Sequence, residues 1–175
     1  MTSTTVVPSQ SDGSRTKPTF SVATWNIRSG RNGGLESACR ALESLNVDIA
    51  FLQETKLTNG IHTRNSSGYS IVASEAPSKH KGGIALCWRE NRLFELEETK
   101  FLSHHVMTFR LITGGLRYYV VGVYIPPSSV VELTHIRQAY AECPSRFQPI
   151  LIGDLNIDLE SPRNERDEEI AEQVD

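Results

Sequence analysis

Three apolar segments of the chain end in polar side chains of the kinds that perform metal and phosphate chemistry. Asn26 lies in "TWNI", Glu54 follows "FLQ", and Asp154 and Asn156 follow "LIG". Ligand sites of open α/β sheets gather beyond the carboxyl ends of their strands. A single polar residue there can simply cap a turn, but here three strands end this way and two of them carry a carboxylate. We therefore expect a functional site at this edge.

The residue types at these strand ends fit phosphoryl chemistry. Glu54 could bind a hard cation, since Mg²⁺ sites use one or two carboxylates and otherwise keep water. Asp154 could orient or deprotonate a water molecule, and Asn156 could offer its amide to a phosphate oxygen. Tyr124 ends the run "VVGV" and adds a hydroxyl at another strand end. Taken alone, Tyr124 is better interpreted as a core residue whose hydroxyl is hydrogen-bonded.

A strand, a helix and a second strand are predicted at residues 20–27, 35–45 and 47–55, and they form an α/β unit with a right-handed crossover. The second strand is a continuous apolar run, typical of a strand buried on both faces. The charges of residues 93–102 allow a helix as well as a strand, and we favour the strand. The remaining expected elements are strands at 69–74 and 82–90, a hairpin of 105–112 and 116–125, a helix at 130–143 and a strand at 147–158. Strands outnumber helices, which favours a layered α/β sandwich over a doubly wound fold.

Five motifs occur in a characteristic order along the chain: "TWNI", "LQETKL", "KGGIAL", "VVGVYIPP" and "LIGDLNID". On these motifs, residues 21–158 resemble the endonuclease/exonuclease/phosphatase superfamily, the fold of deoxyribonuclease I, exonuclease III and the abasic-site endonucleases. The strings "WNIRSGRNGGLE" and "LQETKLTNGIHTRNSSGY" are most similar to the endonuclease domains of fungal non-LTR (LINE-like) retrotransposons. The resemblance implies a four-layered α/β sandwich of the deoxyribonuclease I-like type, incomplete at the C-terminus. It also implies hydrolysis of DNA phosphodiesters that depends on Mg²⁺, with Mn²⁺ as the alternative cofactor.

The resemblance assigns roles to the strand-end residues. Glu54 matches the metal-binding glutamate, and Asn26 matches an asparagine that binds metal or orients its neighbours. Asp154 matches the aspartate that positions or activates the attacking water, and Asn156 matches its phosphate-contacting neighbour. Tyr124 matches a tyrosine whose hydroxyl faces the scissile phosphate.

Two departures from the family pattern limit the functional interpretation. Arg28 stands where abasic-site enzymes usually carry an aspartate, which argues against abasic-site repair. The closing Asp-His motif is absent, and the five histidines are interpreted as surface loop or strand positions (His62, His80, His104, His105 and His135).

Three functions therefore remain open. The first is a DNA endonuclease domain of a retrotransposon polyprotein, with a reverse transcriptase (RNA-directed DNA polymerase) region expected downstream. The second is a catalytically inactive remnant or binding module. The third is a phosphatase of the same superfamily, and the retrotransposon-like strings count against it.

Composition sets outer bounds on these functions. The 175 residues include 18 basic and 21 acidic side chains, a net charge of -3, unlike a general nucleic-acid coat protein. No apolar run approaches the length of a membrane span, and no secretory signal is visible, so we expect a nuclear or cytoplasmic protein. We expect a disordered leader at 1–19, the domain at 20–160, and an acidic tail at 161–175 that begins a helix. The oligomeric state stays open.

Two lysine-containing segments are weighed as DNA contacts. The basic loop "SKHKGG" at 78–83 could touch a DNA backbone, and it could equally be a solvated turn. Lys56 could reach a phosphate, but an exposed loop lysine is the better interpretation.

Overall fold

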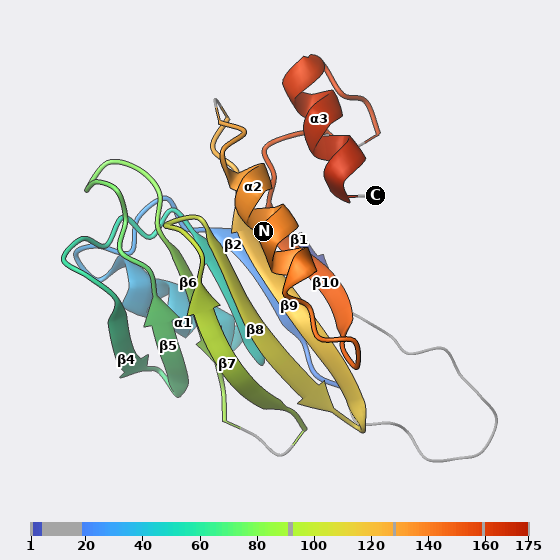
Figure 1. The fold of residues 1–175 in the computed structure, drawn as a ribbon. Helices are drawn as coiled ribbons and strands as arrows, with labels where there is room; N and C mark the ends of the chain where they lie inside the picture. Colours follow the sequence, from blue (N-terminus) through green and yellow to red (C-terminus); the bar gives the residue numbers. More distant parts are fainter. Residues whose placement is uncertain (1, 5–18, 91–92, 128, 159, 175) are drawn as a thin grey trace.

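The computed structural model describes residues 2–4, 19–90, 93–127, 129–158 and 160–174. Two β-sheets pack face to face, and helices cover their outer faces (Figure 1). One sheet has six strands in the order β1-β2-β3-β6-β5-β4, and the other has four in the order β10-β9-β8-β7. The predicted four-layered α/β sandwich is thereby confirmed.

The elements follow one another as strands that are interrupted by three helices. The strands are β1 (Thr2–Thr4), β2 (Val22–Asn26), β3 (Ile49–Gln53), β4 (His62–Ser66), β5 (Tyr69–Ala73), β6 (Ile84–Trp88), β7 (Glu95–Phe101), β8 (Val106–Thr113), β9 (Leu116–Tyr124) and β10 (Gln148–Asp154). The helices are α1 (Gly34–Ser44), α2 (Glu132–Ala141) and α3 (Glu165–Val174).

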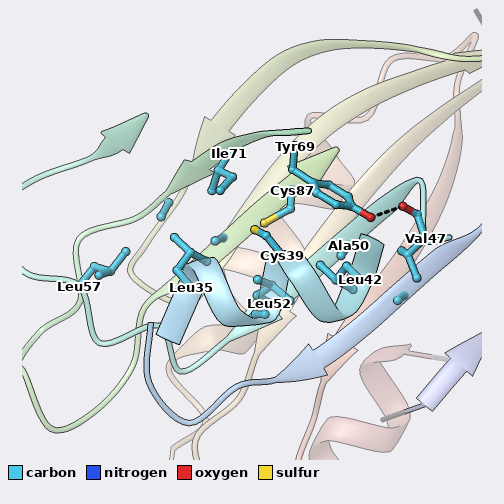
Figure 2. Close-up of a cluster of buried hydrophobic side chains, with 14 residues drawn as sticks. Leu35, Cys39, Leu42, Val47, Ala50, Leu52, Leu57, Tyr69, Ile71 and Cys87 are labelled. Carbon is cyan, nitrogen blue, oxygen red and sulfur yellow. Dashed lines mark hydrogen bonds between the residues drawn. The ribbon is translucent and has the colours of Figure 1, made fainter. Parts of the chain in front are cut away.

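Strand β2, helix α1 and strand β3 form an α/β unit, as predicted. The two strands are parallel neighbours, and the apolar stripe of α1 packs on the outer face of their sheet (Figure 2). In this cluster Leu35 and Leu42 of α1 are fully buried, and the Tyr69 hydroxyl donates to the carbonyl of Val47. All five residues of β3 are buried because alternate side chains face α1 and the second sheet. This explains the continuous apolar run in the sequence.

The main core lies between the two sheets. Ile49 and Phe51 of β3 meet Phe109 of β8 and Val120 of β9 in this layer. At Gly122 of β9 the sheets come so close that an added Cβ would lie 2.5–2.9 Å from three ring carbons of Phe51. A glycine is therefore needed to set the distance between the sheets.

Helix α2 covers the outer face of the four-stranded sheet, and α3 lies next to α2 (Figure 1). Leu133 and Ile136 of α2 pack on Val121 and Val123 of β9, and Ile170 of α3 is fully buried in the same cluster. The acidic tail thus contains a helix that is docked through the buried side chain of Ile170.

The sequence missed two strands. Strand β4 carries mostly polar side chains, so it lacks the apolar alternation that signals a strand. Strand β1 lies within residues 1–19, which we expected to be a disordered leader, and it pairs antiparallel with β2. Residues 1 and 5–18 of that stretch lie outside the described residues. Residues 95–101 form a strand, as favoured, and not a helix.

Within the described residues no helix is long and apolar enough to cross a membrane.

The contact between Gly122 and Phe51 predicts a destabilising substitution. Gly122→Ala should lower the free energy of unfolding by about 1–3 kcal/mol, because the new methyl group overpacks the ring of Phe51. Urea unfolding measures this loss. The double variant Gly122→Ala/Phe51→Leu should recover part of it, and equal stability of Gly122→Ala and the parent protein would contradict this view of the sheet contact.

Candidate active site

The two sheets bring three of the predicted residues into hydrogen-bonding contact. Asn26 ends β2, Glu54 follows its parallel neighbour β3, and Asp154 ends β10 of the other sheet. The Asn26 Nδ2 donates to Glu54 Oε1 at 2.9 Å and to Asp154 Oδ2 at 3.1 Å. One amide therefore joins two carboxylates that are 100 residues apart in the sequence and come from different sheets.

Tyr124 belongs to the same cluster. It ends β9 and is the register partner of Asp154 on the parallel strand β10. Its hydroxyl donates to Glu54 Oε1 at 3.0 Å, although the residue as a whole is only 5% exposed. Burial, followed by the negative charge of Glu54, raises the pKa of Tyr124 well above its usual value, so the hydroxyl keeps its proton and acts as a donor. Tyr124 is thus a buried residue whose hydroxyl partner belongs to the site.

Glu54 lies in a strained turn that is hydrogen-bonded to the backbone of the "KGG" motif. Both Glu54 and Lys56 have left-handed backbone angles, with φ of 56° and 54°. The intervening Thr55 N–H donates to the carbonyl of Gly83 at 3.1 Å, and Lys56 N–H donates to that of Gly82 at 3.0 Å. These backbone hydrogen bonds hold an unfavourable conformation in place. In this structure the "SKHKGG" segment therefore supports the Glu54 turn through its two glycines.

Lys56 forms an ion pair with Glu54, with Nζ 2.8 Å from Oε2. Their side chains are 18% and 23% exposed, so the expectation that Lys56 is an exposed loop residue was wrong. The left-handed backbone turns Lys56 back toward the site. Burial alone would raise the pKa of Glu54, but hydrogen bonds from Lys56, Asn26 and Tyr124 outweigh it and lower that pKa below its ordinary value. Glu54 is therefore ionised at neutral pH.

Asn156 shares a turn with Asp154 and points elsewhere. Its N–H donates to Asp154 Oδ1 at 3.1 Å, and its Nδ2 donates to the carbonyl of Ile125 at 2.9 Å. Asn156 is exposed and contributes no hydrogen bond to Asn26 or Glu54. An open cleft of about 480 Å³ begins at this turn and is bounded by residues 153–158, Arg163 and Asp167. The turn leaves Asp154 facing both the carboxylate cluster and this open space.

The donor set fits a small, hard cation. Two carboxylates, an amide and a phenol hydroxyl converge, and Lys56 already places one positive charge on Glu54 Oε2. The described residues hold no group of three or more His, Cys, Asp or Glu side chains arranged for a metal. Mg²⁺ sites often use only one or two carboxylates and otherwise keep water. Asn26 presents nitrogen to the carboxylates, while its Oδ1 accepts the N–H of Arg28 at 3.1 Å. As arranged, Asn26 orients the carboxylates.

A second polar pair lies behind Tyr124 and was not anticipated from the sequence. His105 Nδ1 is 2.7 Å from Glu132 Oε1, and the two side chains are 14% and 7% exposed. The expected surface position of His105 was therefore wrong. His105 also packs against Tyr124, with the two rings edge-on and 5.5 Å between their centroids. No sequence signal marks this pair, since its members are 27 residues apart and in different elements.

Residues 23–173, most of the chain, match the endonuclease/exonuclease/phosphatase family. The chain belongs to this family. A curated relative, craniofacial development protein 2 of Bos taurus, is 24% identical in an alignment of 154 residues that covers 83% of this chain. The chain spans 25% of the length of that relative.

Solved structures of the family share the fold. The endonuclease domain of TRAS1, a telomere-specific non-LTR retrotransposon, superposes with a TM-score of 0.63 at 14% identity, over 90% of this chain and 71% of that one. The AP endonuclease LMAP of Leishmania major gives 0.54 at 20% identity, over 77% and 54% of the two chains. A family protein of Leptotrichia buccalis gives 0.56 at 15% identity, over 86% and 71%. The structural likeness therefore includes a retrotransposon endonuclease domain, as the sequence motifs indicated.

The buried Glu132 predicts a pH-dependent contribution to stability. Burial raises its pKa, but hydrogen bonds from His105 and Ser129 outweigh burial and lower the pKa below the ordinary value of 4.5. A carboxylate with a depressed pKa stabilises the fold above its unfolded pKa, and this stabilisation is lost as the pH falls through the folded pKa.

We therefore expect Glu132→Gln to cost about 1–3 kcal/mol of unfolding free energy at pH 7. The difference from the parent protein should stay constant down to about pH 5 and shrink below about pH 4.5. Urea unfolding at pH 7, 5.5, 4.5 and 3.5 measures it. A difference that grows on acidification would contradict the assignment.

Proposed function

We propose that this chain is part of a DNA endonuclease that hydrolyses phosphodiester bonds with the help of a divalent cation, Mg²⁺ or alternatively Mn²⁺. The observation that carries the proposal is the hydrogen bonding of Glu54 and Asp154 by one amide, that of Asn26, beside a protonated Tyr124 hydroxyl. Family membership and the TRAS1-like fold support a nuclease over an unrelated hydrolase.

Each side chain receives a role that its contacts allow. Asp154 faces the open cleft and would position the attacking water for in-line attack on phosphorus. The Tyr124 hydroxyl donates to Glu54 Oε1 and would turn its one proton to a phosphate oxygen as charge develops there. Asn156, exposed at the cleft, would contact the phosphate through its amide.

Glu54 is the residue that would hold the cation; of the two roles that the family resemblance gives Asn26, metal ligand or orienting group, its contacts favour the orienting role. When bound, Mg²⁺ would polarise a phosphate oxygen and neutralise charge that develops during attack. Lys56 helps to keep Glu54 ionised, and because its ammonium lies 2.8 Å from Oε2, a cation would compete with Lys56 for this carboxylate.

The strings shared with LINE-like elements favour a retrotransposon context for this endonuclease, with a reverse transcriptase region downstream in a full-length relative. Arg28 is an exposed residue at the position where abasic-site enzymes carry an aspartate, which favours intact DNA as the substrate over an abasic site.

The test is nicking of supercoiled plasmid with Mg²⁺, with and without EDTA. We expect magnesium-dependent nicking that Glu54→Ala and Asp154→Ala each lower by about 100-fold or more, since each removes a charged group at the reacting centre. Glu169→Ala is the matched control, because Glu169 is an exposed carboxylate on α3 paired only at 3.8 Å with Arg137.

Two results would contradict the proposal. Nicking that survives both substitutions would place the chemistry elsewhere, and release of phosphate from small phosphoesters without nicking would favour a phosphatase. If neither this chain nor a C-terminally longer one nicks DNA, the inactive remnant or binding module is the better explanation.

A further inference from the structure

The pair of His105 and Glu132 has no part in the roles above, yet it touches the site. His105 precedes β8 and Glu132 begins α2. The His105 Nδ1 is 2.7 Å from Glu132 Oε1, and the Ser129 hydroxyl donates to Glu132 Oε2 at 2.6 Å. The side chain of Glu132 is 7% exposed. Both carboxylate oxygens are thus engaged inside the protein.

The direction of the hydrogen bond fixes the orientation of the imidazole. An ionised carboxylate can only accept hydrogen bonds, and the lowered pKa of Glu132 keeps it ionised. His105 Nδ1 must therefore carry the proton that it donates to Glu132. A hydrogen bond to a charged partner is short and directional, so it holds the ring more firmly than apolar packing would.

Two further contacts enclose the His105 ring. An added Cβ at Gly82 would lie 2.4 Å from His105 Nε2, so the "KGG" backbone closes one side. The Tyr124 ring closes another, at 5.5 Å between centroids and an interplanar angle of 76°. The Tyr124 N–H also donates to the His105 carbonyl at 2.8 Å. Tyr124 is thus held by His105 through both its backbone and its ring.

A buried hydrogen bond adds only modest net stability. What the pair adds here is geometry. Tyr124 has its hydroxyl 3.0 Å from Glu54 Oε1, and rotation of the whole side chain about χ1 would carry the hydroxyl away from this carboxylate. The His105 ring, held 5.5 Å from the Tyr124 ring between centroids, opposes that movement.

We propose that His105 and Glu132 form a positioning pair that holds the Tyr124 hydroxyl on Glu54 and so at the phosphate. The inference rests on the proposed phosphodiester hydrolysis for its consequence in catalysis. Its structural part, the placement of the Tyr124 hydroxyl, stands apart from activity.

The same network reaches α3. Arg166 Nε donates to the carbonyl of Ser129 at 3.2 Å, and Arg166 Nη2 donates to that of Pro126 at 3.0 Å. These carbonyls belong to the segment between Tyr124 and Glu132. Arg166 thus stabilises the segment that joins Tyr124 to Glu132.

The first test reads Tyr124 directly. In protein labelled with ¹³C at tyrosine Cζ, the Tyr124 resonance is the one lost in Tyr124→Phe. Glu132→Leu removes the anchor of His105 with a side chain that tolerates burial. We expect it to shift the Tyr124 resonance, and we expect Glu132→Gln, which keeps an acceptor, to return it toward the parent position.

The matched control is Glu142→Leu at the C-terminal end of α2, where an exposed carboxylate pairs with Lys100. It should leave the Tyr124 resonance unchanged. His105→Leu removes the ring itself and replaces Glu132→Leu if that variant fails to fold. An unchanged Tyr124 resonance in whichever of these two variants is folded overturns the proposal.

The second test is a double-mutant cycle on nicking. Glu132→Leu should lower kcat about tenfold, the scale of one hydrogen bond, and leave KM for DNA unchanged. In a Tyr124→Phe background the same substitution should change kcat less than twofold, because no hydroxyl remains to be positioned. An equal loss of kcat with and without the Tyr124 hydroxyl overturns the proposal.

The two tests separate this inference from the proposed function. A chain that does not nick DNA counts against the nuclease proposal, and the resonance of Tyr124 still decides the positioning role. A chain that nicks DNA normally with a displaced Tyr124 hydroxyl contradicts the catalytic consequence alone.

Discussion

The hydrogen bonds from Asn26 to Glu54 and Asp154 are the constraint on which the site depends. They bring two carboxylates together, and like charges at close range need a donor between them. The carboxylates come from different sheets, so the sheet packing must be right to within the length of a hydrogen bond. Gly122, against which Phe51 packs without room for a methyl group, helps to set that spacing. The packing of the core between the sheets therefore also determines the geometry of the site.

The site concentrates backbone strain as well as charge. Arg28, Glu54 and Lys56 have φ between 54° and 59°, a conformation that residues other than glycine and asparagine seldom adopt. Such residues persist where surrounding contacts overdetermine them. Here backbone hydrogen bonds to Gly82 and Gly83 hold the Glu54 turn. The strain turns Lys56 back onto Glu54, which regular strand geometry would not do.

The sequence revealed the strand-end residues because apolar runs that stop at a polar side chain are local patterns. Asn26, Glu54 and Asp154 could be found this way. Parallel pairing of β2 with β3 places Asn26 beside Glu54, and packing of the two sheets brings Asp154 to them. Lys56 was misjudged because its direction depends on a left-handed φ that no local pattern encodes. His105 and Glu132 were missed because their contact exists only once α2 packs on the four-stranded sheet. Strand β4 was not predicted because its polar side chains do not alternate with apolar ones.

The helix that follows "LIGDLNID" is connected to the site by a continuous series of contacts. Ile170 of α3 is buried in the cluster that α2 forms with the four-stranded sheet, and Arg166 donates to the carbonyls of Pro126 and Ser129. From there the contacts run through Glu132 and His105 to Tyr124 and Glu54. The acidic residues of α3 would repel DNA if they were spread over a free tail. Docked by one apolar and one cationic side chain, the helix instead supports the segment that carries the active-site tyrosine.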